Sequence, residues 1–460
     1  MKTKLRHSFS DSMGPVEQDG QSSTVEQDSP LNLTNEDLEI SSVELLERFR
    51  RFGHLADLQR AIRVLRELVK STLPRHDRHC VALGNLSFAL KCRFERLGQI
   101  GDLEDAVLIQ RGAVDLTPSG HPDKPRYLND LGDSFKTRFE HLGQHSDLEN
   151  AISAQRDAVN LALNDHPYKP VFLNSLGNSL KTRFERLGQL GDLEAAISMQ
   201  WEAAGLIPDG GFHKPGILNS LGNSFKTRFE CHGQLDDLED AISTQRNAVD
   251  LTLNDHPDKP FILNSLGLSF LTRFERLGQL GDLEDAISTQ RSAAALTPDG
   301  HSHRPIILNS LGNSFKTRFE RLGQLDDLER AISTHKNAVN LTPNGDLHKP
   351  VILNSLGNSF KTRFECLGQL DDLEGAISTQ KDAVDLTLND HPYKPIILHY
   401  LGLSFLTRFE RLGQLNDLEA AISSQKEAVD LIPHGHSHKR VILQSRQLPQ
   451  SSFRPPQPAW

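Results

Sequence analysis

The chain has 460 residues, an apolar content of 37% and a net charge of −10. The apolar fraction is low for a protein built around one large core. The acidic balance argues against binding nucleic acid through its phosphates, which requires a basic face. The four cysteines, with no close pair among them, are typical of free thiols in a reducing compartment and not of a disulfide framework; they are Cys80, Cys92, Cys231 and Cys366.

The N-terminal segment, residues 1–36, is polar and contains the sequence VEQD twice. It cannot bury enough apolar area to order itself, so we expect it to be disordered. No apolar run of signal-peptide length follows the first residues, and nowhere do about 18 apolar residues run together. We therefore expect no membrane contact and a cytoplasmic location.

Residues 37–443 repeat with a period of 45, which is marked by the dipeptide Arg-Phe. A fixed period in this range is typical of stacked-repeat proteins, in which each unit buries its apolar face against its neighbours. Such arrays usually present a surface to partners and carry out no chemistry. The arginines of the dipeptide are Arg48, Arg93, Arg138, Arg183, Arg228, Arg273, Arg318, Arg363 and Arg408.

The first half of each unit predicts a helix, which we call helix A. In residues 350–367, Pro350 suits a first helical turn, and Gly368 follows the last apolar residue, where a glycine favours the left-handed helix end. We expect a helix of about 18 residues, with the first helix A of the chain running from about Glu39 to Phe52. The apolar residues are spaced three and four apart, on one helical face: Leu353, Leu356, Phe360, Phe364 and Leu367.

The second half predicts a second helix, helix B, beginning at Asp372, whose carboxylate we expect to cap the first turn. An aspartate stands at this position in every unit. Ala376 and Ala383 lie on the apolar stripe, and their small side chains allow the two helices to approach closely. Each unit is thus a helix–turn–helix that cannot bury its own apolar face alone.

The pattern of one unit resembles the tetratricopeptide repeat. The order is Leu221–Gly222, then Phe225, Ala241 and Ala248. The resemblance implies an all-α fold, an α-solenoid of about nine antiparallel helix–turn–helix repeats wound into a right-handed superhelix. The family's usual period is 34 residues, so these units are longer. They are similar to fungal arrays that continue into a caspase-like (CHAT) peptidase domain. No residue here matches that domain.

Two columns of polar side chains flank the Leu-Gly pair of helix A and lie four residues apart, on one helical face. The resemblance places helix A on the concave side of the array. A column of amides offers donors and acceptors at a regular rise and could hold an extended peptide by its backbone. The alternative is that these side chains only cap loops or contact solvent. The first column is Asn129, Asn174, Asn219, Asn264, Asn309 and Asn354, and the second is Asn178, Asn223, Asn313 and Asn358.

Other polar residues favour structural roles. We expect Arg138 and its equivalents to pair with acids of helix B such as Glu149. His301 and His303 stand two residues apart in a loop without a third ligand type nearby, so we expect no metal site. No catalytic motif and no phosphate-binding loop is present. We therefore expect no enzyme and no cofactor.

The C-terminal segment, residues 444–460, departs from the repeat. Back-translation and a one-nucleotide shift turn QSRQLPQSSFRPPQPAW into SLGNSLKARFGRLSQL, which resembles the next unit. We therefore hypothesise a frameshift or a gene-model error. Without a following helix A, Ile422 and Val429 of the last helix B lack cover. Because solenoids require a polar capping unit, this end favours self-association.

Three functions follow in order of preference. The first is a non-enzymatic scaffold that binds a protein or peptide partner in the groove lined by helix A. The second is the truncated regulatory region of a longer caspase-like peptidase whose catalytic domain is absent. The third is a self-assembling structural array.

Overall fold

The computed structural model describes residues 34–74, 77–387, 391 and 393–431. Residues 1–33 of the segment 1–36 that we expect to be disordered, and the irregular tail 444–460, lie outside the described residues. The prediction is wrong for residues 35–36, which belong to the first helix. Within the described residues every regular element is an α-helix. The all-helical fold class is therefore confirmed.

The helices form nine successive pairs, which we number as units 1 to 9, with helix A first and helix B second in each. They are α1 (Asn35–Phe52) and α2 (Leu55–Ser71), α3 (Asp77–Leu97) and α4 (Ile100–Leu116), α5 (Lys124–Leu142) and α6 (His145–Leu161), α7 (Lys169–Leu187) and α8 (Leu190–Leu206), α9 (Lys214–His232) and α10 (Leu235–Asp250), α11 (Lys259–Leu277) and α12 (Leu280–Leu296), α13 (Arg304–Leu322) and α14 (Leu325–Leu341), α15 (Lys349–Leu367) and α16 (Leu370–Asp385), and α17 (Lys394–Leu412) and α18 (Leu415–Asp430).

Helix A begins and ends as the sequence predicts. In α15, which has 19 residues, Pro350 lies in the first turn and Gly368 ends the helix in the left-handed conformation with φ 70°. The exception is α1, which begins at Asn35, four residues before the predicted start. Thr34 and Asp37 form a reciprocal capping box there, which the prediction overlooked.

The prediction that Asp372 caps helix B is wrong. Helix α16 begins at Leu370 after Gln369, and no side chain caps it. Asp372 instead accepts hydrogen bonds from Nε and Nη2 of Arg363, at 2.9 and 2.6 Å. The arginine lies one turn before the end of helix A, so a bidentate ion pair joins the two helices of one unit. This geometry turns the carboxylate away from the first-turn N–H groups.

The same arginine also contacts the preceding unit. Nη1 of Arg363 donates to both carboxylate oxygens of Glu329 in α14, at 2.9 and 2.8 Å. Six such pairs link consecutive units: Arg183–Glu149, Arg228–Glu194, Arg273–Glu239, Arg318–Glu284, Arg363–Glu329 and Arg408–Glu374.

The predicted pairing of these arginines with acids of helix B is confirmed, but Glu149 is the partner of Arg183 and not of Arg138. Arg138 bonds Asp147 of its own unit, with Nε to Oδ2 at 2.8 Å, whereas Glu149 bonds Arg183 of the next unit. Glu149 follows Asp147 by two residues on helix B, and this spacing turns its carboxylate towards the following helix A.

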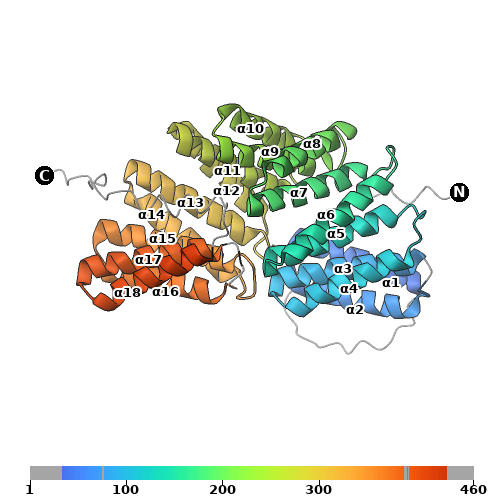
Figure 1. Ribbon diagram of the computed structural model, residues 1–460, viewed down its shortest axis with the longest axis horizontal. Coiled ribbons are helices and arrows are strands. Elements are labelled where there is room, and N and C mark those ends of the chain that lie inside the picture. The colour runs from blue at the N-terminus through green and yellow to red at the C-terminus, as the bar shows by residue number, and fades with distance from the viewer. Residues whose placement is uncertain (1–33, 75–76, 388–390, 392, 432–460) are drawn as a thin grey trace, which may run out of the picture.

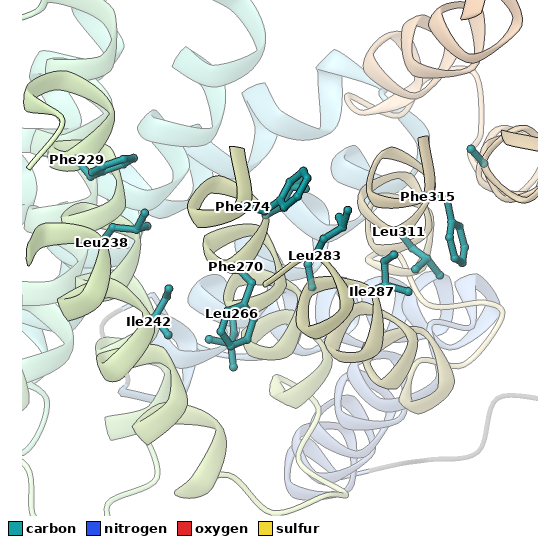
Figure 2. Close-up of a cluster of buried hydrophobic side chains, with 13 residues drawn as sticks. Phe229, Leu238, Ile242, Leu266, Phe270, Phe274, Leu283, Ile287, Leu311 and Phe315 are labelled. Carbon is teal, nitrogen blue, oxygen red and sulfur yellow. The ribbon is translucent and has the colours of Figure 1, made fainter. Parts of the chain in front are cut away.

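Clusters of buried apolar side chains cross the boundaries between neighbouring units. Figure 2 shows Phe229, Leu238 and Ile242 of unit 5 meeting the side chains of unit 6, which in turn reach Leu311 and Phe315 of unit 7. The alanines of helix B are fully buried: Ala376 and Ala383 are each 0% exposed. Their small side chains allow the close helix pairing that the sequence predicts.

Helices A form the inner layer of the stack. Each helix B packs on the helix A of its own unit and of the next unit, and successive helices A, such as α9, α11 and α13, also contact one another. Elements on the inside of a curved stack crowd together, so these contacts place helix A on the concave side. We call the surface of helices A that faces this concavity the inner face.

The array bends until its two halves meet. In Figure 1 the first units and the last units lie along the same lower side, with α8 to α10 above them. Arg96 of α3 donates to the carbonyl of Gly300, which precedes α13, at 2.7 Å. His301 Nε2 lies 3.2 Å from the carbonyl oxygen of Arg50 in α1 and donates to it. Units 1 and 2 therefore contact the loop before unit 7, and Gly98 of unit 2 also lies against Gly345 in the loop before unit 8.

Gly98 and Gly368 each end a helix A, but only Gly98 also lies at the contact between distant units. Gly98 and Gly368 have the same left-handed conformation, with φ 66° and 70°. A Cβ atom on Gly98 would collide with the backbone of Gly345, whereas one on Gly368 would meet nothing within 4 Å.

We predict that Gly368→Ala lowers the free energy of unfolding by about 1 kcal/mol, and that Gly98→Ala lowers it further and also raises the radius of gyration in small-angle scattering. Equal behaviour of the two variants would contradict the turn-to-turn contact.

Candidate functional site

The candidate site is the inner face, where the two asparagine columns lie. The first column is largely buried: Asn219, Asn264 and Asn354 are 3%, 4% and 6% exposed. The side-chain oxygens of all six members of the column have no hydrogen-bond partner among the described residues. Buried acceptors without a donor are uncommon in native proteins. These amides therefore form a row of unused polar atoms just under the inner face.

The second column is half-buried and tied to helix B. Gln200 Nε2 donates to Oδ1 of Asn178 at 2.9 Å, and its Oε1 accepts from the hydroxyl of Ser224 in the next unit at 2.7 Å. Gln245 bonds Asn223 and Ser269 in the same way, at 3.0 and 2.7 Å. The glutamine thus fixes the rotamer of the asparagine and joins two units.

This bonding fixes which atom the second column offers. Because Oδ1 of Asn178, Asn223 and Asn358 is taken by a glutamine, the Nδ2 group is directed away from helix B. No partner for these Nδ2 donors exists in the described part of the chain. Chemically, a row of N–H₂ groups at a repeating interval can donate to the carbonyls of an extended backbone. Asn313 lacks this support, because His335 replaces the glutamine.

A row of Lys–Glu pairs follows the asparagines on helix A. Lys226 and Glu230 lie four residues apart and are joined at 3.0 Å. The pair recurs at Lys136–Glu140, Lys181–Glu185, Lys316–Glu320 and Lys361–Glu365. These pairs are partly exposed, so each contributes little to stability. They leave a charged but locally neutral inner face.

Unit 3 departs from this pattern with two carboxylates, Asp130 and Asp133. Asp133 takes the asparagine position and accepts from Gln155 Nε2 at 2.9 Å. Removal from water raises the pKa of Asp130 to about 6, and the neighbouring charge of Asp133 adds to this shift. The inner face is therefore more acidic in unit 3 than elsewhere.

Other groups singled out in the sequence have local roles. His301 Nδ1 accepts from the backbone N–H of His303 at 3.2 Å, which shapes the loop before α13. Within the described residues, no three His, Cys, Asp or Glu side chains gather as metal ligands. All four cysteines are free, as predicted. No helix of the described chain is long and apolar enough to cross a membrane.

The glutamines of helix B and the Lys–Glu pairs of helix A are not among the site residues predicted from the sequence. Both were visible as residues that recur every 45 positions, as with Gln200, Gln245 and Gln290. A buried amide inside an apolar stripe gives no signal of its partners in the sequence. The pairing of each glutamine with two units becomes visible only in three dimensions.

No protein-family model matches the chain, and no curated protein matches its sequence. Among solved structures it is similar to the human IFIT1 dimer with PPP-AAAA, at a TM-score of 0.53 and 12% identity over 90% of this chain and 95% of that one. It also matches the APC/C hetero-tetramer Cut9–Hcn1 at a TM-score of 0.49 and 16% identity over 90% of this chain and 64% of that one. A third match is YrrB, a TPR protein with an unusual peptide-binding site, at a TM-score of 0.29 and 13% identity over 50% of this chain and 91% of that one.

At these identities the comparisons show the fold alone, and the IFIT1 match carries that conclusion. The chain is a TPR-like helical-repeat array, as the resemblance in its sequence implied. The chain spans 64% of the Cut9–Hcn1 chain that it matches.

His335 makes the glutamine position testable. Its Nε2 donates to the carbonyl of Asn309 at 3.3 Å, and its Nδ1 lies 3.0 Å from the Ser359 hydroxyl. Burial lowers the pKa of His335 from 6.5 to about 4. The folded protein therefore keeps this histidine neutral. The contribution of neutral His335 to the free energy of unfolding is fully present above pH 6.5 and is lost as the pH falls towards 4.

We predict that His335→Gln, which restores the residue of other units, reduces this acid sensitivity. Between pH 7 and pH 5 the variant should lose about 2 kcal/mol less free energy of unfolding than the native chain. Urea denaturation at both pH values measures the difference. Equal losses in the two proteins would show that His335 does not titrate in this way.

Proposed function

We propose that the chain is a non-enzymatic scaffold that binds an extended segment of a protein partner along the inner face. The observation that carries this proposal is the row of Nδ2 donors on Asn178, Asn223 and Asn358, each held in place through its Oδ1 by a glutamine of helix B. A rotamer fixed before binding reduces the entropy that binding costs. The first column supplies acceptors one turn away.

The bend of the array supports an extended partner over a folded one. Units 1 and 2 contact the loop before unit 7 through Arg96 and His301, and Gly98 lies against Gly345 in the loop before unit 8. These contacts restrict access to the concave side. A single extended chain can follow such a surface and offer backbone carbonyls to the Nδ2 donors of units 4, 5 and 8.

The interpretation as a scaffold requires no cofactor and no reaction. The known TPR protein YrrB has a peptide-binding site, which agrees with a peptide or protein partner for this chain. Binding to nucleic acid is disfavoured by the net charge of −10. A cytoplasmic location stays a prediction.

An affinity capture with matched variants tests the proposal. The tagged full-length chain is compared with the inner-face variant Glu185→Lys/Glu230→Lys and with the control Glu202→Lys/Asp240→Lys. All four residues are exposed, and the control pair lies on helices B. We expect mass spectrometry to find a partner that the native chain and the control retain and the inner-face variant loses, with at least about a tenfold drop in affinity.

A partner retained equally by all three proteins would place binding elsewhere and contradict the proposal. Circular dichroism of each variant, with unchanged helical signal and melting temperature, ensures that a loss of binding is not a loss of folding. Both variants change the charge by the same amount, so general electrostatics are matched.

Self-association is a second candidate, favoured by the exposure of α18. Ile422 is 61% exposed, whereas Ile377, its equivalent in unit 8, is 3% exposed beneath the next helix A. Leu415 is also 68% exposed. We expect the average mass from light scattering to rise with concentration and Ile422→Glu to suppress the rise. A monomer at every concentration would exclude this candidate.

The alternative of a truncated regulatory region of a longer caspase-like peptidase stays a prediction. The residues on which it depends, 444–460, lie outside the described part of the chain. The genomic sequence tests it directly: a reading frame that resumes the repeat past residue 443 would support it, and its absence would exclude it.

A further inference from the structure

Unit 6 breaks the polar pattern of the inner face in a specific way. In unit 5 the residues along this face of helix A are Asn223, Lys226 and Glu230. In unit 6 the equivalent residues are Leu268, Leu271 and Glu275. The spacing of three and four residues keeps them on one side of α11. The carboxylate therefore remains, but the lysine that neutralises it in the other pairs is gone.

Glu275 is exposed and has no ion-pair partner within the described residues. The charged groups that face it come from both neighbouring helices A: Lys226 and Glu230 of α9, and Lys316 and Glu320 of α13. Both lysines are already bonded to the glutamate of their own helix, at 3.0 Å for Lys226. The surrounding helices A partly shield the exposed Glu275 from bulk water, and this desolvation raises the pKa of its carboxyl. Its environment thus lacks one positive charge.

A second, independent observation lies beneath Leu268. Gln290 of α12 is 0% exposed, and its Oε1 accepts from the Ser314 hydroxyl at 2.7 Å, as in other units. Its Nε2 group has no partner. In units 4, 5 and 8 the same donor bonds the asparagine that Leu268 replaces. The unused donor is therefore directed at the inner face of unit 6.

The first-column residue of this unit is Asn264, which is 4% exposed and lies one helical turn before Leu268. Its Oδ1 atom is also without a donor among the described residues. Unit 6 thus combines an unused donor, an unused acceptor, two leucines and one uncompensated carboxylate along one side of α11. Unit 9 has the same three residues, Leu403, Leu406 and Glu410. There, however, Gln425 Nε2 donates to the backbone carbonyl of His399, so this donor is satisfied.

We propose that unit 6 binds a lysine or arginine side chain of the partner, with its aliphatic stem over Leu268 and Leu271 and its cationic end paired with Glu275. This inference rests on the proposed function and names the chemistry of the bound segment. The partner supplies in trans the cation that the other units supply in cis. Gln290 donates to a backbone carbonyl of the same segment once the Leu268 side chain rotates to lie along the stem and exposes the Nε2 group.

The repeat itself provides the test variant. Leu268→Asn/Leu271→Lys gives unit 6 the residues of units 4, 5, 7 and 8, so we expect the variant to retain the fold. The new lysine is an ion-pair partner for Glu275, and the new asparagine is a hydrogen-bond acceptor for Gln290. Phage-displayed random dodecapeptides are selected in parallel on the full-length native chain and on this variant. We expect the native chain to enrich peptides with lysine or arginine beside an aliphatic residue, and the variant to lose that enrichment.

Fluorescence anisotropy with the most enriched peptide then isolates the carboxylate. We expect Glu275→Gln to weaken binding at least about tenfold. The matched control Glu365→Gln removes a carboxylate that Lys361 already neutralises and that is not among the charges facing Glu275, and it should change the affinity less than about twofold. Replacing the peptide's cationic residue with norleucine should reproduce the Glu275→Gln loss on the native chain and have no further effect on that variant.

The outcomes separate this inference from the proposed function. Peptides that lack a cationic preference but lose binding to Glu185→Lys/Glu230→Lys would overturn the inference and leave the inner-face scaffold in place. Peptides that bind the native chain and Leu268→Asn/Leu271→Lys equally would also overturn it. If no dodecapeptide is enriched on the native chain, both proposals fail.

Discussion

In units 4 to 9 the structure depends on one arginine per unit that bonds two carboxylates at once. Arg363 is held by Asp372 of its own helix B and by Glu329 of the preceding one. The planar guanidinium fixes the angle at which it meets each carboxylate, so it sets the orientation of helix A relative to both neighbours. Because the arginine side chain is 19% exposed and Asp372 is 7% exposed, the inner of the two pairs is well protected from water. The same geometry recurs from Arg183 to Arg408, so each of these units is oriented in the same way relative to the unit before it.

That constraint explains why equivalent side chains on successive helices A occupy equivalent positions along the inner face. With helix A fixed, Gln200 reaches both Asn178 and Ser224, and the amide donors of successive units lie in equivalent positions. Departures from the regular face then become informative. His335 takes the glutamine position with different protonation chemistry, and Leu268 leaves Gln290 without an acceptor. A repeat array thus carries its own controls, because the neighbouring units show what each position does when it is unchanged.

Most of the fold could be predicted from the sequence, because the determinants of helix pairing are local. The 45-residue period, Pro350 and Gly368 mark the helices almost to the residue. The partners of charged and polar side chains could not be predicted. Asp372 looks like a helix cap because it stands near a helix start, but an arginine nine residues earlier along the chain takes its carboxylate. The asparagine columns were found by spacing, yet the burial of Asn219 and the bond from Gln245 to Asn223 depend on the packing of adjacent helices. The contact of Arg96 with Gly300 depends on the accumulated curvature of several units, to which a single unit gives no clue.

If the inner face of helices A, with an uncompensated carboxylate in unit 6, receives the partner, a crystal structure of the full-length chain with a selected lysine-containing peptide will show it there. We expect an extended peptide along helices A, with its ammonium group within ion-pair distance of the Glu275 carboxylate and its carbonyls bonded to Nδ2 of Asn178 or Asn223. A peptide seated on the outer surface of helices B, or an inner face left open by a bound peptide, would contradict it.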